Sequence, residues 1–374
     1  MANMRTASRQ PIGIAIIALS LLYPAHSAPG QEPPVHVLFT VDVESMNEGN
    51  PQRDIWGALP GSDERHGIER MMNTFDRHGV KGTFFVNVYE AAKHGTDALA
   101  KVCRAISDRG HDVELHTHPD PVFGVYGMRD ASLAKQTEIL RYGAELIERW
   151  TGQKVVAHRA GGYLGNYDTL TACRALGIMS EYSHNWGYHG EGFAEPGLTV
   201  NKAVVRDDVL CVPVTNYIQA KVGGWESLRF LDVEASSPQE IRKVVADLHE
   251  HDVRTAVIMM HSFSFVRGGK VNTRAEGVLD ELLADFVADA DVKVVTASQL
   301  YDIWRSDPGR LAGGDYLPTT GLWMTYCRAW QRLDEGWKNL VFAFTPPVLC
   351  LVGIIVAGLY WRCRRRKLPG LSAS

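Results

Sequence analysis

The sequence has no basic face, no closely paired cysteines and no internal repeat. Its 374 residues carry a formal net charge of -4. Lys and Arg are scattered outside the C-terminal end, which argues against a nucleic-acid-binding protein. The six cysteines have no short paired spacing, so neither a zinc ribbon nor a disulfide scaffold is indicated, although one or two disulfides stay open in an oxidising compartment. No segment recurs at a fixed period, which argues against a solenoid or a propeller.

The first 27 residues have the features of a secretory signal peptide. Two arginines precede the uncharged apolar run Pro11–Tyr23, and Ala25 and Ser27 supply small residues where a signal peptidase would cleave. The apolar run is shorter than the roughly 20 residues that a membrane span needs. We therefore predict a signal peptide over residues 1–27, and an uncleaved N-terminal anchor is the alternative.

A second uncharged apolar stretch lies near the C-terminus, over residues 341–361. Its length is enough to cross a bilayer of about 30 Å at roughly 1.5 Å per residue. Tyr360 and Trp361 end the stretch, and the basic run Arg362–Lys367 follows, as is typical of a cytoplasmic flank. We predict a single transmembrane helix over residues 341–361 and a cytoplasmic basic tail over residues 362–374. The body of the protein then lies on the exported side, periplasmic or extracellular.

Between the two ends, short β-branched runs alternate with helical stretches. The predicted strands are Val35–Val41, Lys81–Val86, His111–Leu115, Lys154–His158, Ile178–Tyr182, Val209–Val214, Thr255–Met260 and Val292–Thr296. The predicted helices are Glu64–His78, Thr96–Arg109, Ser132–Trp150, Tyr167–Leu176, Pro238–His251, Thr273–Ala288 and Ser298–Arg305. This alternation predicts an α/β domain over residues 35–305 with a parallel sheet, closed or open. After this domain we predict a linker rich in Pro and Gly (residues 306–321) and then a juxtamembrane segment (residues 322–340). The juxtamembrane segment would lie at the membrane interface or pack on the domain.

Charged or imidazole side chains come at the ends of four predicted strands. They are Asp42 and Glu44 after the first strand, His116 and His118 after the third, Arg159 after the fourth and His261 after the seventh. A spacing of two puts both members of a pair on one side of an extended chain. Two imidazoles and a carboxylate suit zinc or a similar divalent ion. Each group alone is more often a helix cap or a surface residue, but their common place at the strand ends predicts one active site.

The order of these motifs resembles the polysaccharide deacetylase (NodB-homology) family over roughly residues 35–304. The family's Thr-Phe-Asp-Asp-Gly is similar to Thr40–Glu44, its Gly-Thr-Phe-Phe strand to Gly82–Phe85, its Gly-His-Glu turn to Gly110–Val113, its Arg-Pro-Pro-Tyr to Arg159–Tyr163, its Leu-His to Met260–His261 and its closing Val-Thr-x-x-Glu-Leu to Val295–Leu300. The resemblance implies a distorted (β/α) barrel that removes N-acetyl groups from sugars. It makes Asp42 the general base, oriented by Arg159, and His261 the general acid.

The resemblance also implies one divalent metal ion, held by Glu44, His116 and His118. We expect zinc, with cobalt, nickel and manganese as alternatives. Two features depart from the family pattern. Val43 stands where the family has its second aspartate, so the ligand role passes to Glu44, and the two histidines are spaced by two where the family spaces them by four.

The segment from Ser183 to Arg206 is a long insertion between predicted strands and is rich in aromatic and amide residues. We predict that His184 and Trp186 of this loop, together with Tyr163, contact the substrate, because such side chains suit sugar stacking and hydroxyl recognition. The alternative is a loop that only packs on the rim of the domain.

These features predict a membrane-anchored, metal-dependent hydrolase that removes N-acetyl groups from an exported or cell-envelope polysaccharide, by cleaving linear C–N amide bonds. Its partners would be the glycan and the membrane, without nucleic acid. One alternative is a non-catalytic glycan-binding or assembly module on the same fold, which the altered ligand set suggests. Another is an amidohydrolase that acts on a small non-sugar amide.

Overall fold

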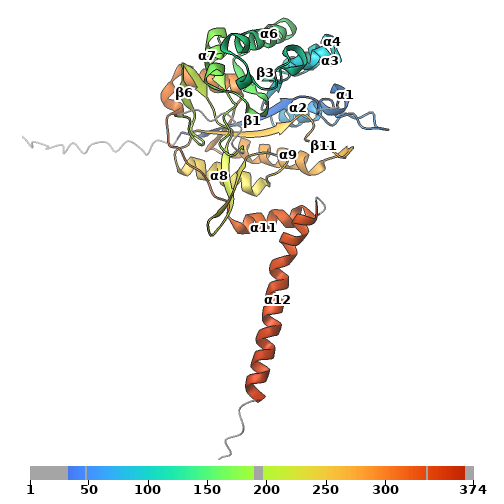
Figure 1. The fold of residues 1–374 in the computed structure, drawn as a ribbon, viewed down its shortest axis with the longest axis vertical. Helices are drawn as coiled ribbons and strands as arrows, with labels where there is room; N and C mark the ends of the chain where they lie inside the picture. The colour runs from blue at the N-terminus through green and yellow to red at the C-terminus, as the bar shows by residue number, and fades with distance from the viewer. Residues whose placement is uncertain (1–32, 47–48, 189–196, 334–335, 367–374) are drawn as a thin grey trace, which may run out of the picture. The chain divides into compact units, whose positions relative to one another are not determined.

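The computed structural model describes residues 33–46, 49–188, 197–333 and 336–366. The predicted signal peptide and the last eight residues of the predicted basic tail lie outside these ranges. The described residues form an α/β domain, and a long C-terminal helix follows it in the chain (Figure 1).

A nine-stranded sheet forms the centre of the domain. Its main path runs in the order β10-β1-β2-β3-β4-β5-β7-β6, and β13 pairs with the first residues of β1. All neighbouring strands are parallel except β6 and β7. The strands are β1 (Val35–Val43), β2 (Thr83–Val86), β3 (Asp112–Thr117), β4 (Ala157–Ala160), β5 (Ser180–Glu181), β6 (Val204–Arg206), β7 (Val209–Cys211), β10 (Thr255–His261) and β13 (Val292–Val294). The predicted parallel α/β sheet is confirmed.

The sheet curls so that its two sides approach each other. The backbone N–H of Thr215, which follows β7, donates to the Val257 carbonyl of β10 at 3.3 Å. An isolated parallel bridge also joins Asp232 to Met259 of β10. These few bonds connect the two sides without a continuous ladder, so the sheet is a curled half-barrel, in agreement with the distorted barrel that was predicted.

Helices cover the outer face of the curled sheet and create the largest of the apolar clusters. The main helices are α2 (Ile68–Arg77), α4 (Thr96–Ser107), α6 (Leu133–Thr151), α7 (Tyr167–Leu176), α8 (Pro238–Glu250), α9 (Thr273–Ala288) and α10 (Ala297–Ser306). Shorter helical turns are α1 (Pro51–Asp54), η1 (Val88–Glu90), α3 (Ala91–His94), α5 (Asp120–Phe123), η2 (Met128–Asp130), η3 (Gly161–Tyr163) and η4 (Pro308–Leu311). The seven predicted helices match the main helices to within a few residues at each end. Gly152 and Gly177 end α6 and α7 in the left-handed conformation, which glycine adopts without a steric penalty.

Alternation along β1 explains why polar residues end up inside the curl. Val37, Phe39 and Val41 belong to the core between the sheet and the helices, whereas Leu38 belongs to the second core inside the curl. Successive side chains of a strand point to opposite faces. Thr40 and Asp42 therefore share the inner face with Leu38, and both are buried.

Several strand boundaries differ from the prediction by up to three residues. The fourth strand begins at Ala157 rather than Lys154, because the buried Glu114 carboxylate accepts the backbone N–H groups of Val156 and Ala157 at 2.9 and 2.8 Å. The fifth strand is only the pair Ser180–Glu181.

Two antiparallel hairpins outside the main sheet were not predicted, and neither was β6, which pairs antiparallel with β7. The larger pairs β8 (Asn216–Val222) with β9 (Trp225–Phe230) across a turn at Gly223 and Gly224. The smaller pairs β11 (Val266–Arg267) with β12 (Lys270–Val271). The Gly-Gly pair between two runs of β-forming residues is itself a hairpin signal, so the larger hairpin was open to prediction.

The predicted juxtamembrane segment contains α11 (Leu322–Gln331), which packs on the domain. The Thr325 hydroxyl donates to the Gln219 carbonyl of β8 at 2.9 Å, and Arg328 Nε lies 3.7 Å from Oε1 of the fully buried Glu240. Packing on the domain is thus observed for α11. In the predicted linker, Leu311 is also buried in the domain.

The last helix, α12 (Trp337–Arg366), contains the predicted transmembrane stretch. Among the described residues, it is the one helix long and apolar enough to cross a membrane, with a mean hydropathy of 2.5 in an 18-residue window within Trp337–Trp361. Length and composition are the basis of this assignment. Pro346 and Pro347 lie inside the helix, so they do not mark its start.

Candidate active site

The strand register brings the predicted site residues to one end of the sheet. Asp42 of β1 pairs with His261 of β10 on one side. His116 of β3 pairs with Arg159 of β4 two strands away on the other side. Because parallel strands end at the same edge of a sheet, these four side chains project from neighbouring strand ends, where the active sites of barrel enzymes lie.

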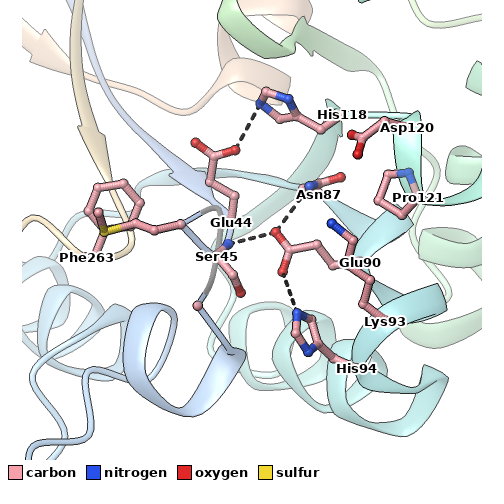
Figure 2. Close-up of a pocket in the computed structure, with 12 residues that line it drawn as sticks. Glu44, Ser45, Asn87, Glu90, Lys93, His94, His118, Asp120, Pro121 and Phe263 are labelled. Atoms are coloured by element: carbon pink, nitrogen blue, oxygen red, sulfur yellow. Dashed lines mark hydrogen bonds and ion pairs between the residues drawn. The ribbon is translucent and has the colours of Figure 1, made fainter. Parts of the chain in front are cut away.

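Glu44, His116 and His118 form a compact cluster at this edge. Their candidate ligand atoms all lie within 4.8 Å of one another. Glu44 Oε2 is 3.0 Å from His118 Nε2 and 3.6 Å from His116 Nε2. Figure 2 shows the Glu44 carboxylate pointing at the His118 ring. The spacing of two along β3 therefore does bring both imidazoles to one carboxylate.

The cluster has the donor chemistry that a divalent metal requires. His116 Nδ1 donates to the Arg159 carbonyl at 3.0 Å, which leaves the Nε2 lone pair directed at the cluster, as in metal-binding histidines. Burial raises the pKa of the Glu44 carboxyl, but hydrogen bonds to the two imidazoles outweigh this effect and hold it well below its usual value. An ionised carboxylate and two imidazoles are thus available, and they fit a zinc-like ion.

Asp42 and Arg159 form a buried ion pair next to the cluster. Arg159 Nη1 donates to Asp42 Oδ1 at 2.6 Å, and Nη2 donates to Thr40 Oγ1 at 3.0 Å. The guanidinium also lies over the Phe85 ring, 4.4 Å from its centroid. The Arg159 side chain is fully buried. These contacts fix the orientation of the Asp42 carboxylate and leave its second oxygen for other partners.

His261 lies near the other carboxylate oxygen of Glu44, and its ring is hydrogen-bonded to Glu234. His261 Nδ1 donates to Glu234 Oε1 at 3.2 Å, and Nε2 is 3.9 Å from Glu44 Oε1. Ser264 also donates to the Glu234 carboxylate. Burial lowers the pKa of His261, but the hydrogen bond to Glu234 and the charges of Asp42 and Glu44 outweigh it and raise this pKa to about 9. The imidazole is thus protonated at neutral pH.

Sequence reasoning missed Glu234. The signal was present, because Asp232-Val233-Glu234 repeats the Asp42-Val43-Glu44 triplet at another strand-like segment. The bridge from Asp232 to Met259 holds this segment beside β10.

The segment that carries Glu234 is tied to the end of α11. The Ala235 carbonyl accepts from Arg332 Nη1 at 2.8 Å and from Arg328 Nη1 at 3.4 Å. The Glu234 carbonyl accepts from Arg332 and from Arg274 Nη2. The backbone next to the partner of His261 is therefore held by arginines at the C-terminal side of the domain.

The three residues predicted to bind substrate have different surroundings. Tyr163 is buried, and its ring packs 5.0 Å from the Tyr188 ring. His184 is 1% exposed, and its Nε2 donates to the Thr199 carbonyl at 2.7 Å. Trp186 is 53% exposed. Part of the insertion, residues 189–196, lies outside the described residues. Of the three side chains, only the Trp186 ring is open to a ligand in this structure, and the substrate role of all three stays a prediction.

Comparison with known proteins shows a similarity to the polysaccharide deacetylases. The polysaccharide deacetylase family model matches residues 58–180, and no curated protein matches the chain. A solved structure from Mycobacterium smegmatis, assigned to the polysaccharide deacetylases, is 19% identical with a TM-score of 0.49, and covers 78% of this chain and 96% of its own. A family 4 carbohydrate esterase from Streptomyces lividans in complex with acetate is 13% identical (TM-score 0.39; 76% and 98% covered). A CE4 family pseudoenzyme from Bacillus anthracis is 14% identical (TM-score 0.39; 72% and 66% covered).

A curled α/β sheet with carboxylates and histidines at its carboxyl edge accompanies this similarity to the polysaccharide deacetylases. The polysaccharide deacetylase family model matches about a third of the chain. The resemblance predicted from the motifs is thus confirmed, although the matched residues begin after the Asp42–Glu44 motif and end before His261.

Proposed function

We propose that this protein is a metal-dependent deacetylase that removes N-acetyl groups from an exported or cell-envelope polysaccharide. The observation that carries the proposal is the arrangement around Glu44. Its carboxylate contacts His116 and His118, and the Asp42–Arg159 pair and His261 lie on neighbouring strand ends. A metal site flanked by a candidate base and a candidate acid is what amide hydrolysis needs.

Glu44, His116 and His118 would hold the ion, and zinc is our first choice among zinc, cobalt, nickel and manganese. When bound, such an ion polarises the amide carbonyl and lowers the pKa of water. The donor set agrees with this assignment, because it contains two imidazoles and one ionised carboxylate.

Asp42 and His261 would move the protons. Water adds to the amide carbon while Asp42 accepts a proton from it, and Arg159 keeps the carboxylate correctly oriented. His261 then donates a proton to the leaving nitrogen as the C–N bond breaks, which yields acetate and the free amine of the sugar. Glu234 would position His261 by accepting from Nδ1, so that the protonated Nε2 faces the cluster.

The location of the protein is also a proposal. The α12 helix would anchor the domain in the membrane, with the domain on the periplasmic or extracellular side and the basic tail in the cytoplasm. The length and composition of Trp337–Trp361 support an anchor, and the basic residues after it support this orientation. An enzyme held at such a surface would meet envelope polysaccharides.

The test combines metal content with acetate release from the full-length protein in detergent, using chitooligosaccharides and peptidoglycan fragments. His116→Ala should lose the metal. Asp42→Asn and His261→Ala should keep it and lose activity by about 100-fold to 10,000-fold. His251→Ala, an exposed histidine that stacks on Tyr316, is the matched control and should keep both. Metal binding without acetate release from any glycan would favour a glycan-binding module, and release from small amides alone would favour an amidohydrolase.

A further inference from the structure

The aromatic side chains of α11 form a stripe on the side of the helix that faces away from the domain. The Trp323 and Tyr326 rings stack with centroids 5.7 Å apart, and the Tyr326 and Trp330 rings are 6.3 Å apart. Residues three, four or seven positions apart share one face of a helix. The other face packs on the domain, where Thr325 and Ala329 are buried. Trp323 is 73% exposed, so its ring is open to the surroundings.

The charge of α11 is confined to the side that packs on the domain. Among its 10 residues, all of which the structure describes, Arg328 is the one charged residue. Arg328 Nε lies 3.7 Å from Glu240 Oε1, and its Nη2 donates to Gln219 Oε1 at 3.2 Å. The aromatic stripe therefore carries no charge. Soluble proteins rarely expose a contiguous apolar patch unless it contacts a partner or a membrane.

The stripe continues onto α12 at a defined depth. The Trp330 ring packs against Phe344, with centroids 4.8 Å apart. Phe344 is three residues beyond Val341, where the uncharged stretch begins, and this corresponds to about 4.5 Å along a helix. If α12 crosses the bilayer, Trp330 is thus at the level of the first turn of the span. Trp and Tyr rings prefer this level, because an apolar ring with a polar tip suits the headgroup region.

The tip of the β8–β9 hairpin lies at the same end of the domain as the start of α11. Thr319, just before α11, forms a parallel bridge with Ile218 of β8. The chain therefore runs toward the hairpin tip before the helix begins at Leu322. Trp225 follows the glycine turn at the tip and is 59% exposed. The hairpin thus supplies a second exposed aromatic ring near the stripe.

We propose that the aromatic stripe of α11 and Trp225 form one surface that lies in the headgroup region of the bilayer and holds the domain against the membrane. The inference rests on the proposed anchor, because α12 sets the depth of the stripe. The partner of the surface is lipid, since the stripe is continuous with the proposed span and carries no charge that would recognise a polar partner. A domain held at this surface keeps one orientation toward the membrane, whereas a domain attached by α12 alone would tumble.

The test is fluorescence quenching of the full-length protein in phosphatidylcholine vesicles whose acyl chains carry bromine close to the headgroup. Bromine quenches the tryptophans that contact lipid, and vesicles without bromine give the unquenched emission. Trp225→Phe and Trp323→Phe should each lower the quenched emission by roughly a tenth or more, because each removes one of the 9 tryptophans of the chain from the bilayer surface. Both variants keep an aromatic ring at an exposed position, so they should leave the fold intact.

Trp186→Phe is the matched control. Trp186 is also exposed, but it lies at the other end of the hairpin, where the Gly187 N–H donates to Asn216 Oδ1 at 2.8 Å. The 7 residues of β8 separate that end from the tip by about 20 Å at roughly 3.3 Å per residue. Trp186→Phe should leave the quenched emission unchanged. Absence of the loss in Trp225→Phe or in Trp323→Phe, or an equal loss in all three variants, would overturn the surface.

Carbonate extraction of the same vesicles separates this inference from the proposed anchor. If the protein resists extraction and the two variants are quenched as much as the parent, the surface fails and the anchor stands. If carbonate extracts the protein, but both variants show the loss of quenching before extraction, the anchor fails and the surface stands. Acetate release from chitooligosaccharides is measured on the same vesicles, and its absence overturns the deacetylase without changing the quenching.

Discussion

Replacing Arg159 by methionine tests the buried ion pair at the base of the candidate site. The guanidinium donates to Asp42 Oδ1 at 2.6 Å and to Thr40 Oγ1 at 3.0 Å, and it lies 4.4 Å from the Phe85 ring centroid. Methionine fills part of the same volume but supplies no charge and no donor. The Asp42 carboxylate, whose side chain is 5% exposed, would then be buried without a cation.

The expected loss follows from the burial of both partners. Removing one member of a buried pair costs about 3–5 kcal/mol of unfolding free energy, chiefly because the remaining charge is left uncompensated. In the double variant Asp42→Asn, Arg159→Met no such charge remains. The double variant should therefore lose less than the sum of the two single variants, with a coupling energy of about 2 kcal/mol.

Urea unfolding of the full-length protein in detergent, followed by tryptophan fluorescence, gives the midpoint and slope for each variant. Arg174→Met is the matched control. Arg174 Nη1 also lies 2.6 Å from a carboxylate oxygen, that of Asp207, but the Arg174 side chain is 44% exposed, so we expect a loss below about 1 kcal/mol. A loss for Arg159→Met no larger than that of the control, or single losses that add to within about 0.5 kcal/mol, would refute the reasoning.

Three further predictions concern the surroundings of the site. A Cβ on Gly161 would lie 2.3 Å from the His118 ring, so Gly161→Ala should displace that imidazole and weaken metal binding by about 10-fold to 100-fold in a metal titration. Burial lowers the pKa of His111 from 6.5 to about 4. As the pH falls from 6.5 to about 4, the unfolded state therefore binds a proton that the folded state does not, and the free energy of unfolding falls by about 3 kcal/mol. His111→Gln should flatten that part of the stability–pH curve. A Cβ on Gly143 would lie 2.6 Å from Leu115 Cδ1, so Gly143→Ala should lower the unfolding free energy by about 1–3 kcal/mol in urea.

The strands and the polar residues at their ends could be predicted because both depend on local patterns. Apolar runs of a few residues, bounded by glycine and by helical stretches, predicted the strands of the parallel sheet. The strand register then brings Asp42 beside His261. Their neighbours Glu44 and Ser262 share a hydrogen bond although 218 residues separate them. No local sequence pattern shows that these residues are close in space. The rule that parallel strands end at one edge of a sheet predicts it.

The parts that were missed depend on tertiary contacts between segments without a strong pattern of their own. Glu234 is placed beside His261 by one isolated bridge and three arginines, not by a regular strand. Glu90, the last residue of the 3-10 turn η1, is joined to the end of β1 by the Ser45 N–H, which donates to its carboxylate from 45 residues away. Short turns and single bonds of this kind leave no periodic signal in a sequence.

The arginines of α11 and of its C-terminal end have a consequence for where the protein can be cut. Arg328 and Arg332 hold the Ala235 carbonyl next to Glu234, and Trp330 packs 4.8 Å from Phe344 of α12. A soluble fragment that stops at residue 321 would discard both guanidinium groups and free the backbone beside the partner of His261, whereas one that runs to residue 333 would keep them. The proposed membrane anchor and the proposed general acid His261 would therefore depend on the same helix, and a graft of a different anchor should keep the chain up to Arg332.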